Sequence, residues 1–575
     1  MSLTKVSYAM INGDPVNVLD YGAVGDGIAN DTAALQAAAA IGKPIYLPEG
    51  NYLITASITL TNDLYGPGTI TFANLVAVVI NADYITIDGV NFAGTSNTGT
   101  AAAIAIFSTQ NSYLTVKNCV ITNSRVTVRN QQLAFVYGFR FQNNTVNADF
   151  TNVEHIINQN DVLTVRGVNG VWITDNNFTI LNVHRVFKIA DTEAATTAGT
   201  PYRDRNIYIT NNRVVGSTDS GKQVMDLYFF TSDIIISNNT FEVTGFGTVI
   251  ENKTGETQNY NQNTIITNNI LSNDDTCVLL QGSYGSTNPA YNVGYQNAII
   301  EGNVLISTTD TLVGTPHPLN LRFYNSMQVI NNNIITPIIF SQTTGLPAIE
   351  IGSCGYTIIN NNSISNGLIN NVVFTTNSQA ETFDAEMYSI EIQGNTIANF
   401  GGSGVLGGIV VSNVNKPNLS VNINGNYVKQ NVDAVVSAGC VGITNSTINN
   451  FVVSNNIGVM ANAAEQRLRI LTSTITEVVE ANNSWNQIGR ASITYDPGAI
   501  GAGGIETTTL TVTGATANTD VVTRVQFGRA LQGLVLTAWV SATDTVTVQF
   551  YNPTGGSIDL LSGTLSVVVQ RFTAV

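Results

Sequence analysis

A short phrase repeats along most of this 575-residue chain, and the repeat limits the fold more than any other feature. From about residue 86 to residue 483, a β-rich run is followed by Asn-Asn or Gly-Asn and then by another apolar run. The second polar residue of each phrase marks the repeat at Gly89, Asn118, Asn144, Asn177, Asn212, Asn239, Asn269, Asn303, Asn333, Asn362, Asn395, Asn426, Asn456 and Asn483. Successive markers lie 26 to 35 residues apart, a period typical of stacked repeat folds.

The runs between the markers have the composition of strands, because they are short, rich in Ile, Val, Thr, Phe and Tyr, and bounded by Asn or Gly. Asn tolerates a left-handed backbone and therefore suits a tight corner. Asn amides at the same corner of successive coils can bond to one another. A coil of about 30 residues has room for three short strands, so the repeat predicts a right-handed parallel β-helix of about 13 coils. Propeller blades are the alternative, but their repeats are longer and no Trp-Asp signature is present.

The composition bounds the class of protein and its partners. Only 11% of the residues are charged, against about 25% in typical globular domains, yet no apolar run reaches the length of about 18 residues that crosses a membrane. The net charge of -16 argues against a nucleic-acid partner, whose phosphates attract positive charge. A polysaccharide partner fits better. Because the four cysteines lie far apart, we expect buried free thiols and neither a disulfide framework nor a metal site.

The two ends of the chain differ from the repeat. Residues 1–52 are predicted to form an N-terminal arm and a helix that covers the open end of the β-helix, with Asp31 as the N-cap of a helix over 32–40. Residues 53–490 are predicted to be the β-helix, and 491–505, with Asp-Pro-Gly and Gly-Ala-Gly-Gly, a linker. Residues 506–575 alternate polar and apolar residues around an Asn-Pro-Thr-Gly-Gly turn, which predicts a small antiparallel β-sandwich.

The stretch from Asn17 to Tyr52 resembles the opening of the pectate-lyase-like β-helix proteins typical of bacteriophage tailspikes. It contains the loop Tyr-Gly-Ala-Val-Gly-Asp-Gly at 21–27, an Asp-Thr pair before an Ala-rich helix, and the turn Pro-Glu-Gly-Asn-Tyr at 48–52. Within that pattern we interpret Asp26 and Asp31 as loop and cap residues. The Asn-rich coils extend the resemblance over most of the chain.

The resemblance implies a homotrimer whose C-terminal module trimerises the shaft. It also implies a bacterial surface polysaccharide, capsule or O-antigen, as the partner, and a virion tail or baseplate protein as a further one. No nucleic acid, membrane insertion, cofactor or metal is expected. The N-terminus has no apolar core of a signal peptide, so the expected location is the virion tail, or the extracellular space after host lysis.

The sequence contains no phosphate loop, no Gly-x-Ser-x-Gly elbow and no His-Glu-x-x-His, which leaves carboxylate chemistry on a carbohydrate. In the strand 10–17 residues after each marker, a polar residue adjoins an apolar one that would point into the core. Since stacked coils lie about 4.8 Å apart, these polar residues could form one outward ladder. Its members would be Glu154 or His155, Lys188, Asp226, Glu251, Gln281, Arg322 and Glu350.

Asp226 and Glu251 would lie on adjacent coils, at a separation near the ~5–5.5 Å of retaining glycosidases. We therefore predict them as a catalytic pair, in which proximity raises one pKa as a general acid requires. The residues expected to bind the sugar chain are Glu154, His155, Lys188, Asp191, Tyr228, Arg322, Tyr324 and Glu350. A ladder of alternating charges would also stabilise a parallel sheet without any catalytic role.

The predicted function is therefore binding and endo-acting hydrolysis of a bacterial surface polysaccharide. A second possibility is a polysaccharide lyase that works by β-elimination or an epimerase, which would use the basic residues His184, Arg185, Lys188, Arg203 and Arg205. No calcium loop of paired acids accompanies them, and the same residues could simply form a solvated loop. A third possibility is a non-catalytic adhesin or structural spike, because the fold alone does not decide the function.

Overall fold

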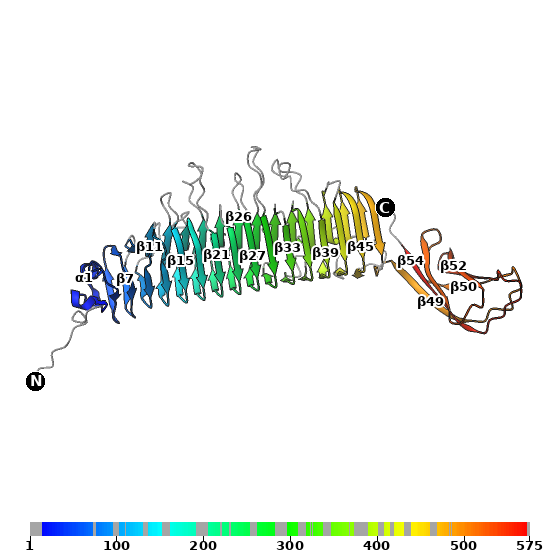
Figure 1. Ribbon diagram of the computed structural model, residues 1–575, viewed down its shortest axis with the longest axis horizontal. Coiled ribbons are helices and arrows are strands. Elements are labelled where there is room, and N and C mark those ends of the chain that lie inside the picture. Colours follow the sequence, from blue (N-terminus) through cyan, green and yellow to red (C-terminus); the bar gives the residue numbers. More distant parts are fainter. Residues whose placement is uncertain are drawn as a thin grey trace, which may run out of the picture.

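A computed structural model gives the structure of the chain. It describes residues 14–571 except 73–75, 96–102, 110, 130–135, 152–160, 191–204, 219–220, 229–231, 254–261, 282–295, 309–317, 323, 325, 337–346, 353, 367, 373–388, 401–406, 415–418, 431–438, 460–467, 482 and 485. Figure 1 shows its strands stacked along one long axis, with α1 (Thr32–Ala39) at the N-terminal end and a separate module, β49–β54 (487–571), beyond the other end.

Three long parallel sheets form the sides of a parallel β-helix, so the predicted fold is confirmed. Among the described residues, sheet A has 17 strands from β1 (Val16–Asn17) to β48 (Thr474–Ala481), sheet B has 16 from β2 (Asp26–Asn30) to β46 (Ile457–Val459), and sheet C has 15 from β5 (Ile58–Leu60) to β47 (Leu468–Leu471). Each coil adds one strand to each sheet, in register with the coil before it. The inward residues form one continuous core of mainly Ile, Val, Leu and Phe.

A chain of buried asparagine amides runs along the corner between sheets A and B, as the repeat predicted. In each link, the backbone N–H and side-chain Nδ2 of one Asn donate to the Oδ1 of the Asn in the next coil, at 2.9–3.0 Å for Asn269 with Asn303 and Asn303 with Asn332. The Nδ2 also donates to a backbone carbonyl of the preceding coil, as Asn269 does to Ile236 at 2.9 Å. The buried amides are therefore satisfied without water.

Four of the predicted markers miss the inward position: Gly89 and Asn118 lie one residue too early, at the left-handed corner itself, and the other two lie one residue too late. The buried amides belong to Asn176 and Asn332, whereas Asn177 and Asn333 are exposed at the start of the next strand. From Asn144 to Asn456, each ladder Asn directly follows a residue with a left-handed backbone, such as Asp175 (φ 60) or Asn331 (φ 56). In a run of three polar residues, this backbone conformation decides which amide turns inward.

The N-terminal end is covered as predicted, and Asp31 occupies the N-cap position of the helix, but its side chain does not cap the helix. Helix α1 (Thr32–Ala39) buries Leu35, Ala38 and Ala39 in the main core. The Asp31 carboxylate, 1% exposed, makes no cap hydrogen bond and instead accepts the backbone N–H groups of Val24 at 2.7 Å and Gly25 at 3.2 Å. Its role is to hold the glycine loop against the first coil.

We expect Asp31→Ala to reduce the free energy of unfolding by about 3 kcal/mol, because two backbone N–H groups of the glycine loop would lose a buried, charged acceptor. Thermal unfolding followed by circular dichroism measures the change. Asp26→Ala is the matched control, since the exposed Asp26 carboxylate also accepts two backbone N–H groups, from Ile28 and Ala29, where water can replace it. Equal losses in the two variants would contradict this role for Asp31.

The C-terminal module is a small antiparallel sandwich, and it begins earlier than predicted. One sheet has the order β49 (Gln487–Tyr495), β54 (Gly563–Arg571), β51 (Asp520–Phe527), and the other β50 (Ile505–Thr511), β53 (Thr545–Tyr551), β52 (Val535–Ala542). They share a core separate from that of the β-helix. Because β49 pairs with β54, residues 487–495 belong to the module, and this corrects both the β-helix boundary at 490 and the linker at 491–505.

Candidate functional site

Three charged side chains lie next to one another on the outer face of sheet C. β20 (Arg185–Ala190), β23 (Gln223–Tyr228) and β26 (Thr248–Lys253) are neighbours, and their register places Lys188 beside Asp226 and Asp226 beside Glu251. The preceding residue of each strand lies in the core, so these three point away from it. They are nevertheless only 8%, 5% and 5% exposed. We call Lys188, Asp226 and Glu251 the sheet C triad.

Beyond the triad, the predicted ladder is right for Glu350 and wrong for Gln281 and Arg322. Glu251 pairs with Leu279, and the row continues through Asn320 to Glu350. Gln281 and Arg322 belong to a second row, two residues further along their strands. The sequence pattern aligned the strands by their polar residues, whereas the register is decided by the apolar residues on both sides, such as the buried Leu280. Leu279 thus ends the run of charges after Glu251.

Arg185, which the sequence indicated only for the lyase alternative, links the acids together with Asp161 and Gln223, which the sequence did not single out. Arg185 Nη1 lies 3.3 Å from Asp161 Oδ1, and Arg185 Nε lies 2.9 Å from Asp226 Oδ2. Gln223 Nε2 donates to Glu251 Oε2 at 2.8 Å, and Gln223 Oε1 accepts from Arg185 Nε at 3.3 Å. Arg185 therefore joins two carboxylates directly and reaches the third through Gln223. Asp161 and Gln223 carried no sequence signal, because their partners lie 24 and 28 residues away.

His184 also lies in this cluster, just before β20. Its Nδ1 is 3.0 Å from Asp161 Oδ1, and both side chains are buried. Of the basic residues proposed for a lyase, His184, Arg185 and Lys188 thus surround one buried carboxylate. Arg205 is the exposed first residue of β21 (Arg205–Thr210), and Arg203 lies outside the described residues.

Burial and charge shift the pKa values of Asp226 and Asp161, the two acids that flank Arg185, in opposite directions. Burial raises the pKa of Asp226, and the nearby Glu251 and Asp161 carboxylates add to this, against the opposing charges of Arg185 and Lys188. Burial would raise the pKa of Asp161 as well, but the His184 hydrogen bond and the charges of Arg185 and Lys188 outweigh it, so that this pKa is lowered. Neighbouring acids with pKa values shifted apart are typical of acid–base sites.

Burial lowers the pKa of the Lys188 ammonium to about 8 from its usual 10.5, and the charges of Arg185 and Arg166 add to this. The unfolded chain therefore binds more protons than the folded one between these values, so the folded state gains stability as the pH rises through this window. We expect the melting temperature of the wild type to rise relative to that of Lys188→Met between pH about 8 and about 10. Lys117→Met, which removes an exposed ammonium, is the control. A temperature difference that does not change with pH would contradict the shift.

The other predicted sugar-binding residues are scattered. Arg322 forms an ion pair with Glu350, Nη2 to Oε1 3.2 Å, away from the triad. Tyr324 is fully buried, so its assignment to the sugar-binding face is wrong. Strand β32 ends at Arg322, and the alternation of inward and outward residues does not continue into the corner beyond it. Glu154, His155, Asp191 and the side chain of Tyr228 lie outside the described residues.

The described part of the chain contains no group of three or more His, Cys, Asp and Glu side chains arranged to hold a metal ion. All four cysteines are free and buried, as predicted. No helix in the described ranges is long and apolar enough to span a membrane.

Comparison with known proteins confirms the pectate-lyase-like resemblance. Residues 15–240 match the family model described as rhamnogalacturonase A/epimerase, pectate lyase-like. No curated protein matches the chain. Similar solved structures include a mutant tailspike protein of E. coli bacteriophage HK620 in complex with a pentasaccharide, with a TM-score of 0.44 and 11% identity over 97% of this chain and 94% of that chain. The tailspike gp49 from Pseudomonas phage LKA1 has a TM-score of 0.43 and 12% identity over 97% of this chain and 99% of that chain.

Proposed function

We propose that this protein is a tailspike-like depolymerase that binds a bacterial surface polysaccharide and hydrolyses it with Asp226 and Glu251. One observation carries the proposal: two carboxylates lie side by side on adjacent strands, and burial raises the pKa of one of them. The match of residues 15–240 to a family model named for polysaccharide-modifying enzymes supports the substrate class. The resemblance of residues 17–52 to tailspike openings supports a bacterial surface polymer, a homotrimer and a virion tail location.

In the proposed reaction, Asp226 is the general acid. Burial raises the pKa of this carboxyl, which favours its protonated form, and Asp226 would donate that proton to the glycosidic oxygen as the bond to the anomeric carbon breaks. Glu251, one strand away, attacks that carbon and forms a glycosyl ester. The Asp226 carboxylate then removes a proton from water, which hydrolyses the ester and releases Glu251. Gln223, bonded to Glu251, would orient the nucleophile.

Elimination is a second candidate, which the lowered pKa of Lys188 favours. An amine with a pKa of about 8 is partly neutral near physiological pH and could remove the proton next to a uronate carboxyl. Arg185, already paired to Asp161 and Asp226, would have to exchange one of these partners to hold that carboxylate. Hydrolysis requires no such exchange, and for this reason we favour it.

The chemistry of the products distinguishes hydrolysis from elimination. The protein is incubated with capsule and O-antigen preparations, and new reducing ends are measured together with the ultraviolet absorbance of a conjugated double bond. Reducing ends without new absorbance are the expected result. New absorbance that is lost in Lys188→Met would establish elimination instead. Binding without either product would identify an adhesin.

A further inference from the structure

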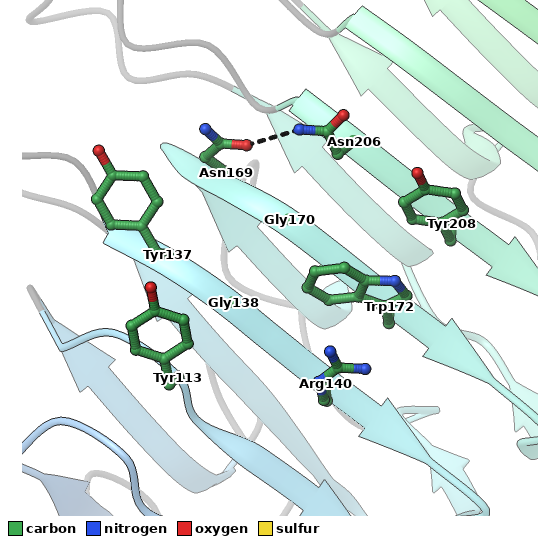
Figure 2. Close-up of a pocket in the computed structure, with 9 residues that line it drawn as sticks. All are labelled: Tyr113, Tyr137, Gly138, Arg140, Asn169, Gly170, Trp172, Asn206 and Tyr208. Carbon is green, nitrogen blue, oxygen red and sulfur yellow. Dashed lines mark hydrogen bonds between the residues drawn. The ribbon is translucent and has the colours of Figure 1, made fainter.

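A second site lies on the outer face of sheet A, around the corner from the triad. It is a pocket of about 310 Å³ across β12 (Thr115–Lys117), β15 (Val136–Gln142), β18 (Val168–Thr174) and β21. Figure 2 shows its lining residues, which come mainly from the starts of these strands: Tyr113, Tyr137, Gly138, Arg140, Asn169, Gly170, Trp172, Asn206 and Tyr208. Four of the nine are aromatic, in a chain with only 8% aromatic residues.

The rings form ordered pairs. Trp172 and Tyr208 are register partners, with their planes 3° apart and their centroids 5.8 Å apart. Tyr113 is nearly parallel to Tyr84 from the preceding coil, at 10° and 4.6 Å. Glycine leaves room for the rings beside the backbone, because a Cβ added at Gly170 would lie 2.7 Å from the Trp172 ring, and one at Gly138 would lie 2.6 Å from the Tyr113 ring.

Two of these tyrosines have an unfavourable backbone. Tyr84 (φ 63) and Tyr113 (φ 61) are in the left-handed region, at the corner where successive coils enter sheet A. At this corner the next coils have Gly138, Gly170 and Asn206, residue types that adopt this conformation readily. A bulky residue with positive φ is an outlier, and such strain is found mainly at functional sites. The fold alone would favour Asn or Gly at both positions.

Polar groups flank the rings. The guanidinium carbon of Arg140 lies 4.1 Å from the centroid of the Trp172 ring, and Asn206 Nδ2 donates to Asn169 Oδ1 at 2.9 Å. None of the nine lining residues is an Asp or Glu, so the pocket lacks the two carboxylates that glycoside hydrolysis uses. Aromatic faces with a few oriented polar groups suit ligand binding without catalysis.

We propose that this pocket, the aromatic pocket, is a non-catalytic subsite for a pyranose ring of the polysaccharide. The apolar C–H face of the sugar would lie across the outer edges of the stacked Trp172 and Tyr208 rings, and its hydroxyls would bond to Arg140, Asn169 and Asn206. The polymer as ligand rests on the function proposed above. β17 (Asp161–Arg166), which carries Asp161, is joined to β18 through Gly167 alone, so the two sites share a corner of the same coils. One polymer chain could thus be held here and cleaved at the triad.

Glycan binding tests the pocket separately from cleavage. The Asp226→Asn protein, in which turnover is prevented, is applied with and without Trp172→Ala to a printed array of bacterial capsule and O-antigen oligosaccharides. We expect Trp172→Ala to bind at least about tenfold more weakly. Trp539→Ala is the matched control, because Trp539 is 44% exposed in the C-terminal module. Equal binding by both Trp variants, or no binding by the intact protein, would overturn the proposal.

A second variant separates binding from folding. The double variant Tyr84→Asn, Tyr113→Asn places a residue that tolerates positive φ at both strained corners. We expect binding to fall while the melting temperature stays at or above that of the wild type. A lower melting temperature with unchanged glycan binding would show that the two rings stabilise the fold and do not bind the glycan, which would overturn the proposal. A change in oligomer mass in light scattering, without loss of glycan binding, would make the pocket an interface between copies, which also overturns the proposal.

Discussion

Asp226→Asn is expected to lower the rate of depolymerisation about a thousandfold, the largest effect on activity that the structure predicts. The amide preserves the size of the side chain but cannot donate a proton to the leaving oxygen. Burial raises the pKa of this carboxyl, which favours the protonated form that the proposed reaction uses. Reducing ends released from the responsive polysaccharide measure the rate.

Glu251→Gln is expected to be equally impaired, because it removes the nucleophile. The matched control is Glu242→Gln, in β25 (Thr240–Thr244), an exposed acid in the same coil that faces solvent on sheet B. If the Asp226 and Glu251 variants both retain the activity of Glu242→Gln, the pair is not catalytic, and the charges of the triad stabilise the sheet only.

Asn269→Ala is expected to reduce the free energy of unfolding by about 4 kcal/mol, the largest effect on stability. Asn269 Oδ1 accepts both the backbone N–H and the Nδ2 of Asn239, at 2.9 Å each, and its own Nδ2 donates to the Ile236 carbonyl. Alanine would leave the buried backbone N–H of Asn239 without its acceptor, and it would remove one partner each from Asn239 Nδ2, which keeps the Ile209 carbonyl, and from the Ile236 carbonyl. Because large β proteins often unfold irreversibly, the unfolding rate in guanidinium chloride is the appropriate measurement.

Asn297→Ala is the control for the ladder. Asn297 is exposed and also donates its Nδ2 to an Asn of the coil before it, Asn263 Oδ1, at 3.3 Å. Since water can replace that bond, we expect a change below about 0.5 kcal/mol. If both variants unfold at similar rates, the amide ladder contributes no more to stability than a surface stack does.

The repeat identified the β-helix because several independent features recur with the same short period. Apolar runs of strand length, corner residues that accept positive φ, and amides that can bond from coil to coil all recur together. The off-by-one placement at 176 and 332 shows the limit of this pattern. Among consecutive asparagines, composition is uniform, and only the backbone conformation chooses the buried one.

The sequence predicted site residues correctly only where the spacing of polar residues along the chain matched the register of the paired strands. Lys188, Asp226 and Glu251 are brought together as the pattern indicated. Gln281, Arg322 and Tyr324 were misplaced because strand register and corner geometry depend on which apolar side chains fill the core. Asp161 and Gln223 were missed because a buried ion-pair network depends on partners from neighbouring coils.

The sequence by itself determined the parallel β-helix, its capped N-terminal end, its C-terminal sandwich and the adjacency of Asp226 and Glu251. These follow from local patterns that repeat once per coil. Only the tertiary structure decided which acids are buried, how Arg185 links them, and that rings from four coils meet in the aromatic pocket. The reason is physical: burial, pKa shifts and ring packing arise between coils, from residues about 30 positions apart, where no local pattern relates one side chain to the other.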